Sequence, residues 1–172
     1  MARFFLLIVL LVAAALANEP ANQIIQNRLP EHCNLARSSK SNLTTLSNGK
    51  RYSFYPTEKN WTSANETCAK MGLHLATIRD LNEAQIVAAE GNRIKKDDAW
   101  WVSAKNQGSG SEKEFHWSDG TKLELDSPLW MDNAYKKKDC VLIYHGWNKG
   151  KLTSNICNYG TPFICELPRE CY

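Results

Sequence analysis

Cys68-Ala-Lys-Met-Gly-Leu-His-Leu-Ala-Thr-Ile78 is the segment most informative about the fold, because it joins the end of a predicted helix to the motifs that follow. Asn60 is a residue type that caps helices, and Gly72 is one that ends them. Between them the apolar residues repeat at intervals of three and four, at Trp61, Ala64, Cys68 and Met71. The sequence therefore predicts a short helix that begins after Asn60 and closes at Gly72.

Further motifs and cysteines follow this helix in a fixed order. They are Trp100-Trp101-Val-Ser-Ala104, Phe115-His-Trp-Ser-Asp-Gly120, Cys140, Cys157 and Phe163-Ile-Cys165-Glu166. This order and spacing resembles the C-type lectin-like domain over residues 51–166, and the conjunction of the motifs is far more specific than any one of them. The resemblance implies that Trp101-Val-Ser-Ala104 is a core strand and that Trp117-Ser-Asp-Gly120 leads into a long loop region.

The coarse secondary structure is that of an α+β protein, with two helices packed on small antiparallel sheets and a long loop region, stapled by disulfides. Asp80 and Glu83 form a capping pair for the second helix, which we expect to end at Gly91. The first strand, from residue 51, is expected to end at Pro56, because proline cannot donate to a sheet. The other predicted strands are residues 99–104, 140–144, 152–157 and 162–166. Residues 105–139 form the loop region, with buried anchors predicted at Phe115, Trp117, Leu123 and Trp130.

The N-terminus has the pattern of a cleaved signal peptide over residues 1–17. A basic start is followed by an apolar run over residues 4–15 and by the small residues of Ala15-Leu-Ala17. A membrane anchor is the competing interpretation, but this run is shorter than the roughly 20 apolar residues that span a bilayer. We therefore expect a secreted chain with no membrane span, a polar leader over residues 18–50, and one lectin-like domain over residues 51–172.

Composition argues against nucleic acid binding and against catalysis. Removal of Arg3 with the signal peptide leaves 20 basic residues, one fewer than the 21 of the whole chain, against 18 acidic ones, which is too even a balance for a nucleic-acid partner. The four histidines, at His32, His74, His116 and His145, are scattered without a nucleophile at a helpful spacing. We expect no enzyme activity, no cofactor and no zinc site, and we interpret the tryptophans as core residues rather than sugar-stacking ones.

The six cysteines of a chain in an oxidising compartment predict three disulfides, although spacing alone cannot choose the pairing. The resemblance implies that Cys68 pairs with Cys165 and that Cys140 pairs with Cys157. The remaining two, Cys33 and Cys171, are expected to pair with each other, because the chain ends run side by side in this fold. A covalent dimer through either of them is the alternative, so both monomer and dimer stay open.

Function in the resembled family depends on a calcium ion in the long loop, and this chain lacks the ligands at the matching positions. Lys138 stands two residues before Cys140, where the family has a glutamate, and Leu152-Thr153-Ser154 stands where the family has Trp-Asn-Asp. A lysine cannot coordinate calcium. Asp139 and Asn155 are out of register by one residue, which turns a strand side chain to the opposite face. We therefore expect the primary calcium site to be absent.

Two hypotheses for the ligand follow. The first is a glycan or extracellular protein, bound without calcium by a face that includes the lysine run and the following hairpin. We call this the candidate ligand face, and it comprises Asp132, Asn133, Tyr135, Lys136, Lys137, Lys138, Thr153 and Ser154. Its basic character suits an anionic partner, although the lysines could equally be solvated. The second hypothesis is a calcium-dependent lectin in which Asp126, Asp132 and Asp139 rebuild the site.

Three glycosylation sequons begin at Asn42, Asn60 and Asn65. We expect Asn42 to be occupied first and Asn65 second. Asn60 is the doubtful one, because its side chain is also the predicted cap of the first helix.

Overall fold

The computed structural model describes residues 29–39, 41–109, 112–136, 138–144 and 150–172. The predicted signal peptide lies outside these residues, as do Lys137 and His145. The α-helices are α3 (Glu31–Ser38), α4 (Trp61–Lys70) and α5 (Leu81–Ile94). The short 3-10 helices are η1 (Ala134–Lys136) and η2 (Arg169–Cys171). The strands are β1 (Thr44–Thr45), β2 (Arg51–Lys59), β3 (His74–Leu75), β4 (Ala99–Asn106), β5 (Phe115–His116), β6 (Lys122–Leu123), β7 (Cys140–Tyr144), β8 (Lys151–Asn155) and β9 (Thr161–Glu166).

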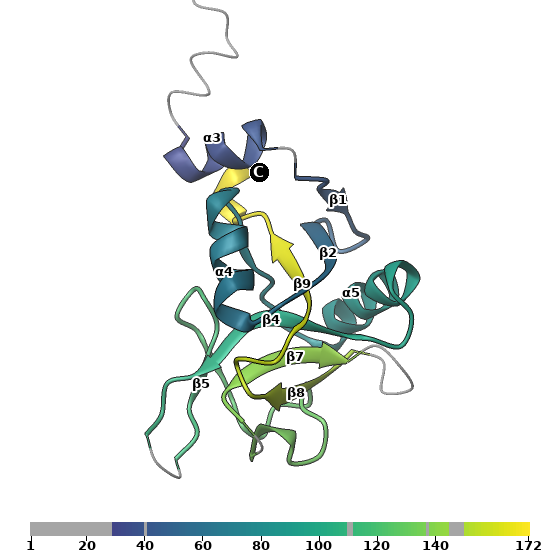
Figure 1. Ribbon diagram of the computed structural model, residues 1–172, viewed down its shortest axis with the longest axis vertical. Coiled ribbons are helices and arrows are strands. Elements are labelled where there is room, and N and C mark those ends of the chain that lie inside the picture. Colours follow the sequence, from purple (N-terminus) through teal and green to yellow (C-terminus); the bar gives the residue numbers. More distant parts are fainter. Residues whose placement is uncertain (1–28, 40, 110–111, 137, 145–149) are drawn as a thin grey trace, which may run out of the picture.

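The strands join in one continuous hydrogen-bonded arrangement that has two arms. The order along the first arm is β1-β2-β9-β4-β5-β6, with β3 also paired to β9. The second arm is the β7–β8 hairpin, which pairs with β4 through β7. Figure 1 shows α3 and the C-terminus at one end of the molecule and the β7–β8 hairpin, with the loop region beside it, at the other. This is the predicted α+β class, with helices on a sheet whose strand pairs are antiparallel except for the parallel pair β4 and β9.

Strand β4 separates two hydrophobic clusters, because successive side chains of a strand point to opposite faces. Trp100 packs into a cluster with α5 and the anchors of the loop region. Trp101 packs into a second cluster with α4 and the cysteines of the disulfides. Both indole rings are fully buried. The predicted core strand therefore lies between the two hydrophobic clusters, and it extends past residue 104 to Asn106.

The capping residues of both predicted helices are confirmed. The Asn60 side chain accepts a hydrogen bond from the backbone N–H of Ser63 at 2.8 Å, and α4 begins directly after it. The Asp80 side chain does the same for Glu83 at 2.8 Å. The prediction that α5 ends at Gly91 is wrong, because the helix continues to Ile94. An interior glycine costs a helix only about 1 kcal/mol relative to alanine, and Gly91 is buried within a helix whose other buried residues hold it on the core.

The first strand also continues past its predicted end. Strand β2 runs through Pro56 to Lys59, and its register against β9 shifts between Tyr55 and Lys59. Proline lacks a backbone N–H, so it is tolerated in a strand where a bulge interrupts the pairing. Strand β8 ends at Asn155 instead of reaching Cys157.

Helix α3 lies within the segment that the sequence predicts as a polar leader, and it packs against the body of the fold. Cys33 on this helix is fully buried and forms a disulfide with Cys171 near the C-terminus. Gly72, with φ of +71°, lies so close that a side-chain carbon there would meet the His32 carbonyl oxygen at 2.0 Å. The part of the leader from residue 29 onward is thus integrated with the fold, while the domain boundary at residue 51 stays a prediction.

Two further disulfides join Cys68 to Cys165 and Cys140 to Cys157. Together with the bond between Cys33 and Cys171, this is the expected pairing, and no cysteine is free. In the chain-entropy model, a bridge that closes a long loop stabilises the folded state by about 3 to 5 kcal/mol. None of the helices in the described ranges combines the length and the apolar character needed to cross a membrane.

Candidate ligand face

The loop region over residues 105–139 is held in place by its aromatic anchors, as predicted. Phe115, Trp117, Leu123 and Trp130 are all buried. The rings of Phe115 and Trp130 meet edge to face with centroids 5.1 Å apart, and Trp130 Nε1 donates to the carbonyl of Glu124 at 3.0 Å. The loop therefore has a packed base from which its polar residues project.

The tryptophans in the described residues are structural. Trp100, Trp101, Trp117 and Trp130 are buried, and Trp61 donates its indole N–H to the Val102 carbonyl at 2.9 Å. The sixth tryptophan, at position 147, lies outside the described residues. The core interpretation is confirmed for the four buried tryptophans, and Trp61 is half-buried against the cluster that contains Trp101.

The turn around η1 supplies the most exposed part of the candidate ligand face. Asp132, Asn133 and Lys136 are exposed, and Asn133 adopts a left-handed backbone conformation with φ of +53°. Tyr135 is half-buried against Trp130, with ring centroids 6.0 Å apart, and Lys136 Nζ lies 5.7 Å from the Tyr135 ring centroid. The tyrosine ring therefore contacts both a buried aromatic residue and a cation.

Ser154 belongs to the core side of β8 and not to the candidate ligand face. It is only 4% exposed, and its hydroxyl donates to the Ala134 carbonyl at 2.6 Å. The same oxygen accepts a hydrogen bond from the backbone N–H of Lys138 at 2.9 Å. Because side chains alternate along a strand, Leu152 and Ser154 point inward while Thr153 is partly exposed. The inclusion of Ser154 as an accessible face residue is therefore wrong, whereas Thr153 and Lys138 remain accessible.

The carboxylates proposed for a rearranged calcium site do not gather in the described residues. Asp139 Oδ1 accepts from Lys113 Nζ at 2.7 Å and from Asn106 Nδ2 at 2.9 Å. The Lys113 hydrogen bond, followed by that of Asn106, lowers the pKa of the Asp139 carboxyl below its usual value. Asp126 and Asp132 are exposed. Among the residues with described positions, the one group of three candidate metal donors whose ligand atoms already lie within 4.8 Å of one another is His32, Cys33 and Cys171, and its two sulfurs are in a disulfide.

The structure brings together a buried ion network that the sequence did not predict. Lys50 Nζ lies 2.7 Å from Glu83 Oε1 and 3.0 Å from Glu166 Oε1, and both carboxylates are buried. Tyr52 donates its hydroxyl to Glu83 at 2.6 Å. Burial lowers the pKa of Lys50, but its hydrogen bonds and ion pairs with the two glutamates outweigh burial and leave that pKa above the usual value. Burial and the Glu83 hydrogen bond also raise the pKa of Tyr52.

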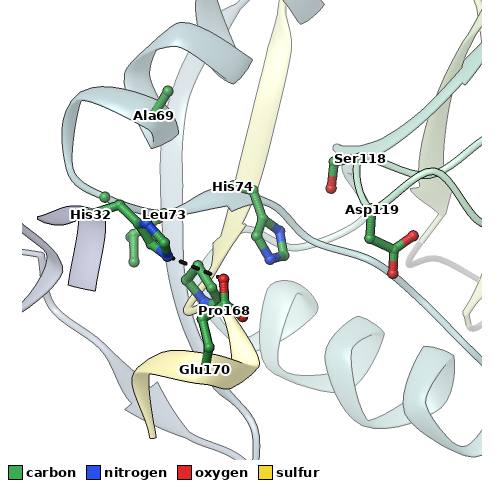
Figure 2. Close-up of a pocket in the computed structure, with 9 residues that line it drawn as sticks. His32, Ala69, Leu73, His74, Ser118, Asp119, Pro168 and Glu170 are labelled. Atoms are coloured by element: carbon green, nitrogen blue, oxygen red, sulfur yellow. Dashed lines mark hydrogen bonds and ion pairs between the residues drawn. The ribbon is translucent and has the colours of Figure 1, made fainter. Parts of the chain in front are cut away.

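A second feature that the sequence did not predict is a cavity of about 410 Å³ at the α3 end of the molecule. His32 from α3, His74 from β3 and Glu170 from η2 line it, together with Asp119 from the loop region (Figure 2). His32 Nε2 lies 3.1 Å from Glu170 Oε1. Asp119 pairs with Arg79. These residues are separated by long stretches of chain, so only the tertiary structure brings them together.

Comparisons with known proteins agree with this architecture. The family model described as the Lectin C-type domain matches residues 57–167. C-type lectin 9a of Crotalus adamanteus is 29% identical over 116 residues, which cover 66% of this chain and 71% of that protein. Rheacalcin-2 of Rhea americana is 25% identical over 130 residues, with 69% of this chain and 88% of that protein covered. The solved structure of TC14, a C-type lectin from the tunicate Polyandrocarpa misakiensis, aligns with a TM-score of 0.57 and 27% identity, over 68% of this chain and 96% of that one. The chain belongs to the C-type lectin domain family.

Proposed function

We propose that this chain is a secreted recognition module that binds a glycan or an extracellular protein without the calcium ion of the family's primary site. The observation that carries the proposal is the double hydrogen bond of Ser154, which ties β8 to η1 and to Lys138. This hydroxyl stands at one of the positions where the family resemblance places a calcium ligand. Its proton and a lone pair are used inside the protein, so it is poorly suited to bind an ion.

The side chains around Ser154 also oppose a cation. Lys138 carries a positive charge two residues before Cys140, and a like charge at close range repels calcium. Thr153 stands where the resemblance places an asparagine ligand, and it offers only a hydroxyl in place of an amide oxygen. Calcium requires six to eight oxygen ligands, and this part of the chain replaces a carboxylate with an ammonium group and two further ligands with hydroxyls. These substitutions support a calcium-independent mode of binding.

The accessible residues of the candidate ligand face support an anionic partner, such as a sulfated glycan or an acidic protein surface. Lys136 and Lys138 are exposed, and the nearby Asp139 is already paired with Lys113. Local positive charge speeds and orients the encounter with an anion. Half-buried Tyr135 adds a flat, packed ring next to these cations. We infer binding rather than catalysis, because the described histidines bond to carboxylates and backbone carbonyls instead of to a nucleophile.

A calcium titration of the secreted protein tests this proposal. Thermal unfolding and tryptophan fluorescence would be followed in chelator and again with calcium at millimolar concentration. We expect the same melting temperature and spectrum in both conditions. Calcium binding would be easy to detect, because a ligand at 100 times its dissociation constant would stabilise the folded state by about 2.7 kcal/mol. A rise in melting temperature that chelator reverses would favour the calcium-dependent lectin with Asp126, Asp132 and Asp139 as its ligands.

A further inference from the structure

Although the scattered histidines of the sequence predicted no zinc site, we propose that His32, His74 and Glu170 form one, which fastens α3 to β3 and to the C-terminal η2. The site lies at the α3 end of the molecule, whereas the candidate ligand face lies at the opposite end, beside the β7–β8 hairpin (Figure 1). It is therefore independent of the proposed recognition function.

His32 and Glu170 already stand close to the spacing of two ligands on one metal ion. His32 Nε2 and Glu170 Oε1 are 3.1 Å apart. Zinc binds histidine nitrogen and carboxylate oxygen at about 2.0 to 2.2 Å in tetrahedral geometry, which places two ligand atoms roughly 3.4 Å from each other.

His74 presents the correct nitrogen to the same cavity. Its Nδ1 lies 2.8 Å from the Leu75 carbonyl oxygen. A carbonyl can only accept a hydrogen bond, so in the neutral ring Nδ1 carries the proton and Nε2 carries the lone pair. A backbone carbonyl that fixes the tautomer in this way is a usual second partner of a zinc-bound histidine. Figure 2 shows the His74 ring projecting from β3 toward the space between Glu170 and Asp119.

The backbone that carries the three donors is held by strong constraints. His32 and Glu170 are each followed directly by a half-cystine, and the Cys33–Cys171 disulfide joins them. The close approach of Gly72 to the His32 carbonyl holds the start of β3 against α3. His74 is itself paired with Glu166 in the sheet. Donors on pre-positioned elements lose little conformational entropy when a metal binds.

Closing the site requires side-chain rotation at the two more exposed donors, because the ligand atoms of His32, His74 and Glu170 do not yet all lie within 4.8 Å of one another. The His32 and Glu170 side chains are 43% and 57% exposed, respectively, so solvent leaves both free to turn toward His74. The cavity volume of about 410 Å³ leaves room for a water molecule as the fourth ligand. Asp119 is not counted as a donor, because Arg79 and the Thr121 hydroxyl and backbone N–H already engage its carboxylate.

Zinc titration of the disulfide-bonded protein without an affinity tag tests the proposal. We expect one zinc ion per chain by calorimetry and a rise in melting temperature with zinc. His32→Gln, His74→Gln and Glu170→Gln should each weaken zinc binding at least about tenfold, comparable to the loss caused by removing metal-site residues. Cobalt substitution gives a second readout, because a tetrahedral site absorbs visible light and His74→Gln should abolish the band.

The chain offers a matched control in another histidine and glutamate pair. His116 Nε2 and Glu114 Oε1 are also 3.1 Å apart. The next charged group that acts on His116 is the Lys122 ammonium, and its positive charge would repel a metal ion. His116→Gln, and likewise His145→Gln, should leave zinc affinity unchanged. Each variant is first checked for correct folding by disulfide mapping and by tryptophan fluorescence without zinc. We expect His32→Gln to fold normally, because the His32 side chain is partly exposed. Absence of zinc binding by the parent, binding that survives His74→Gln, or binding lost in His116→Gln would overturn the proposal.

Discussion

The backbone N–H of Lys138 donates to the hydroxyl of Ser154 at 2.9 Å, and this hydroxyl stands at a position where the family resemblance places a calcium ligand. The same hydroxyl donates to the Ala134 carbonyl at 2.6 Å, so one buried side chain joins η1, the segment before β7, and β8. The base of the candidate ligand face is therefore preformed by the protein itself.

Replacing Ser154 by alanine should destabilise the fold. The change leaves the Lys138 N–H and the Ala134 carbonyl without their partner, and an unsatisfied buried polar group costs about 1 to 3 kcal/mol. Urea unfolding measures this difference. Thr153→Val serves as the control, since its side chain is the partly exposed neighbour on the same strand. Equal loss of stability in both variants would contradict the structural role of Ser154.

Lys50→Met should be strongly destabilising. Lys50 is 14% exposed and is paired with two buried carboxylates, which would be left facing each other without a counter-charge. Breaking a buried ion pair by removal of one partner costs about 3 to 5 kcal/mol. Because the pKa of Lys50 is raised, its stabilising charge is fully present at neutral pH and is lost only as the pH rises through that raised value.

The second variant for this network is Lys50→Met combined with Glu83→Gln. Removal of one carboxylate relieves the repulsion, so the double variant should be more stable than the sum of the two single changes predicts. Strict additivity in urea unfolding would show that Lys50 and Glu83 do not interact.

The ion pair between Lys113 and Asp139 should make the parent protein more stable than the variant Lys113→Met, by an amount that depends on pH. The pKa of Asp139 is lowered in the folded state from an ordinary value of 3.8, first by the Lys113 hydrogen bond. A lowered pKa contributes stability above the ordinary value, and that contribution is lost as the pH falls through the folded-state value. The difference between parent and variant should thus be present at neutral pH and vanish in strong acid. NMR titration of the carboxyl carbon should show its pKa rising in Lys113→Met but not in Lys122→Met.

Replacing Lys136, Lys137 and Lys138 together by serine should reduce the salt concentration at which the protein leaves immobilised heparin. The physical reason is the loss of positive charge from the candidate ligand face. The control removes the same charge elsewhere by changing the exposed residues Lys70, Lys96 and Lys122 to serine. If the two triple variants elute together, the lysine run is ordinary solvated surface.

Peptide mapping of protein from a secretory host should find glycan at Asn42 first and at Asn65 second. Asn42 is exposed and Asn65 is half-buried on α4. Asn60 should carry the least, because its side chain accepts the capping hydrogen bond from Ser63 at 2.8 Å. A fully occupied Asn60 beside an unmodified Asn42 would contradict this order.

The amino-acid sequence determined the local features, since these depend on residues that are close along the chain. Asn60 and Asp80 cap helices through hydrogen bonds to residues three positions later, so the residue type and the following pattern suffice to locate them. The order of cysteines and tryptophans indicated the family and, through the resemblance, the disulfide pairing. Two local predictions were nevertheless wrong. Gly91 does not end α5, because packing holds it on the core, and Pro56 does not end β2, because a bulge accommodates it.

Contacts between residues that are distant in sequence became visible only in the folded protein. Ser154 was expected at the surface, but the strand register turns it inward onto Ala134. The pairing of Lys50 with Glu166 joins β9 to the residue just before β2. His32 and Glu170 are separated by 138 residues and meet because a disulfide beside them joins the two ends of the domain. Such contacts depend on the packing of whole elements against each other, and a linear pattern of residue types does not specify that packing.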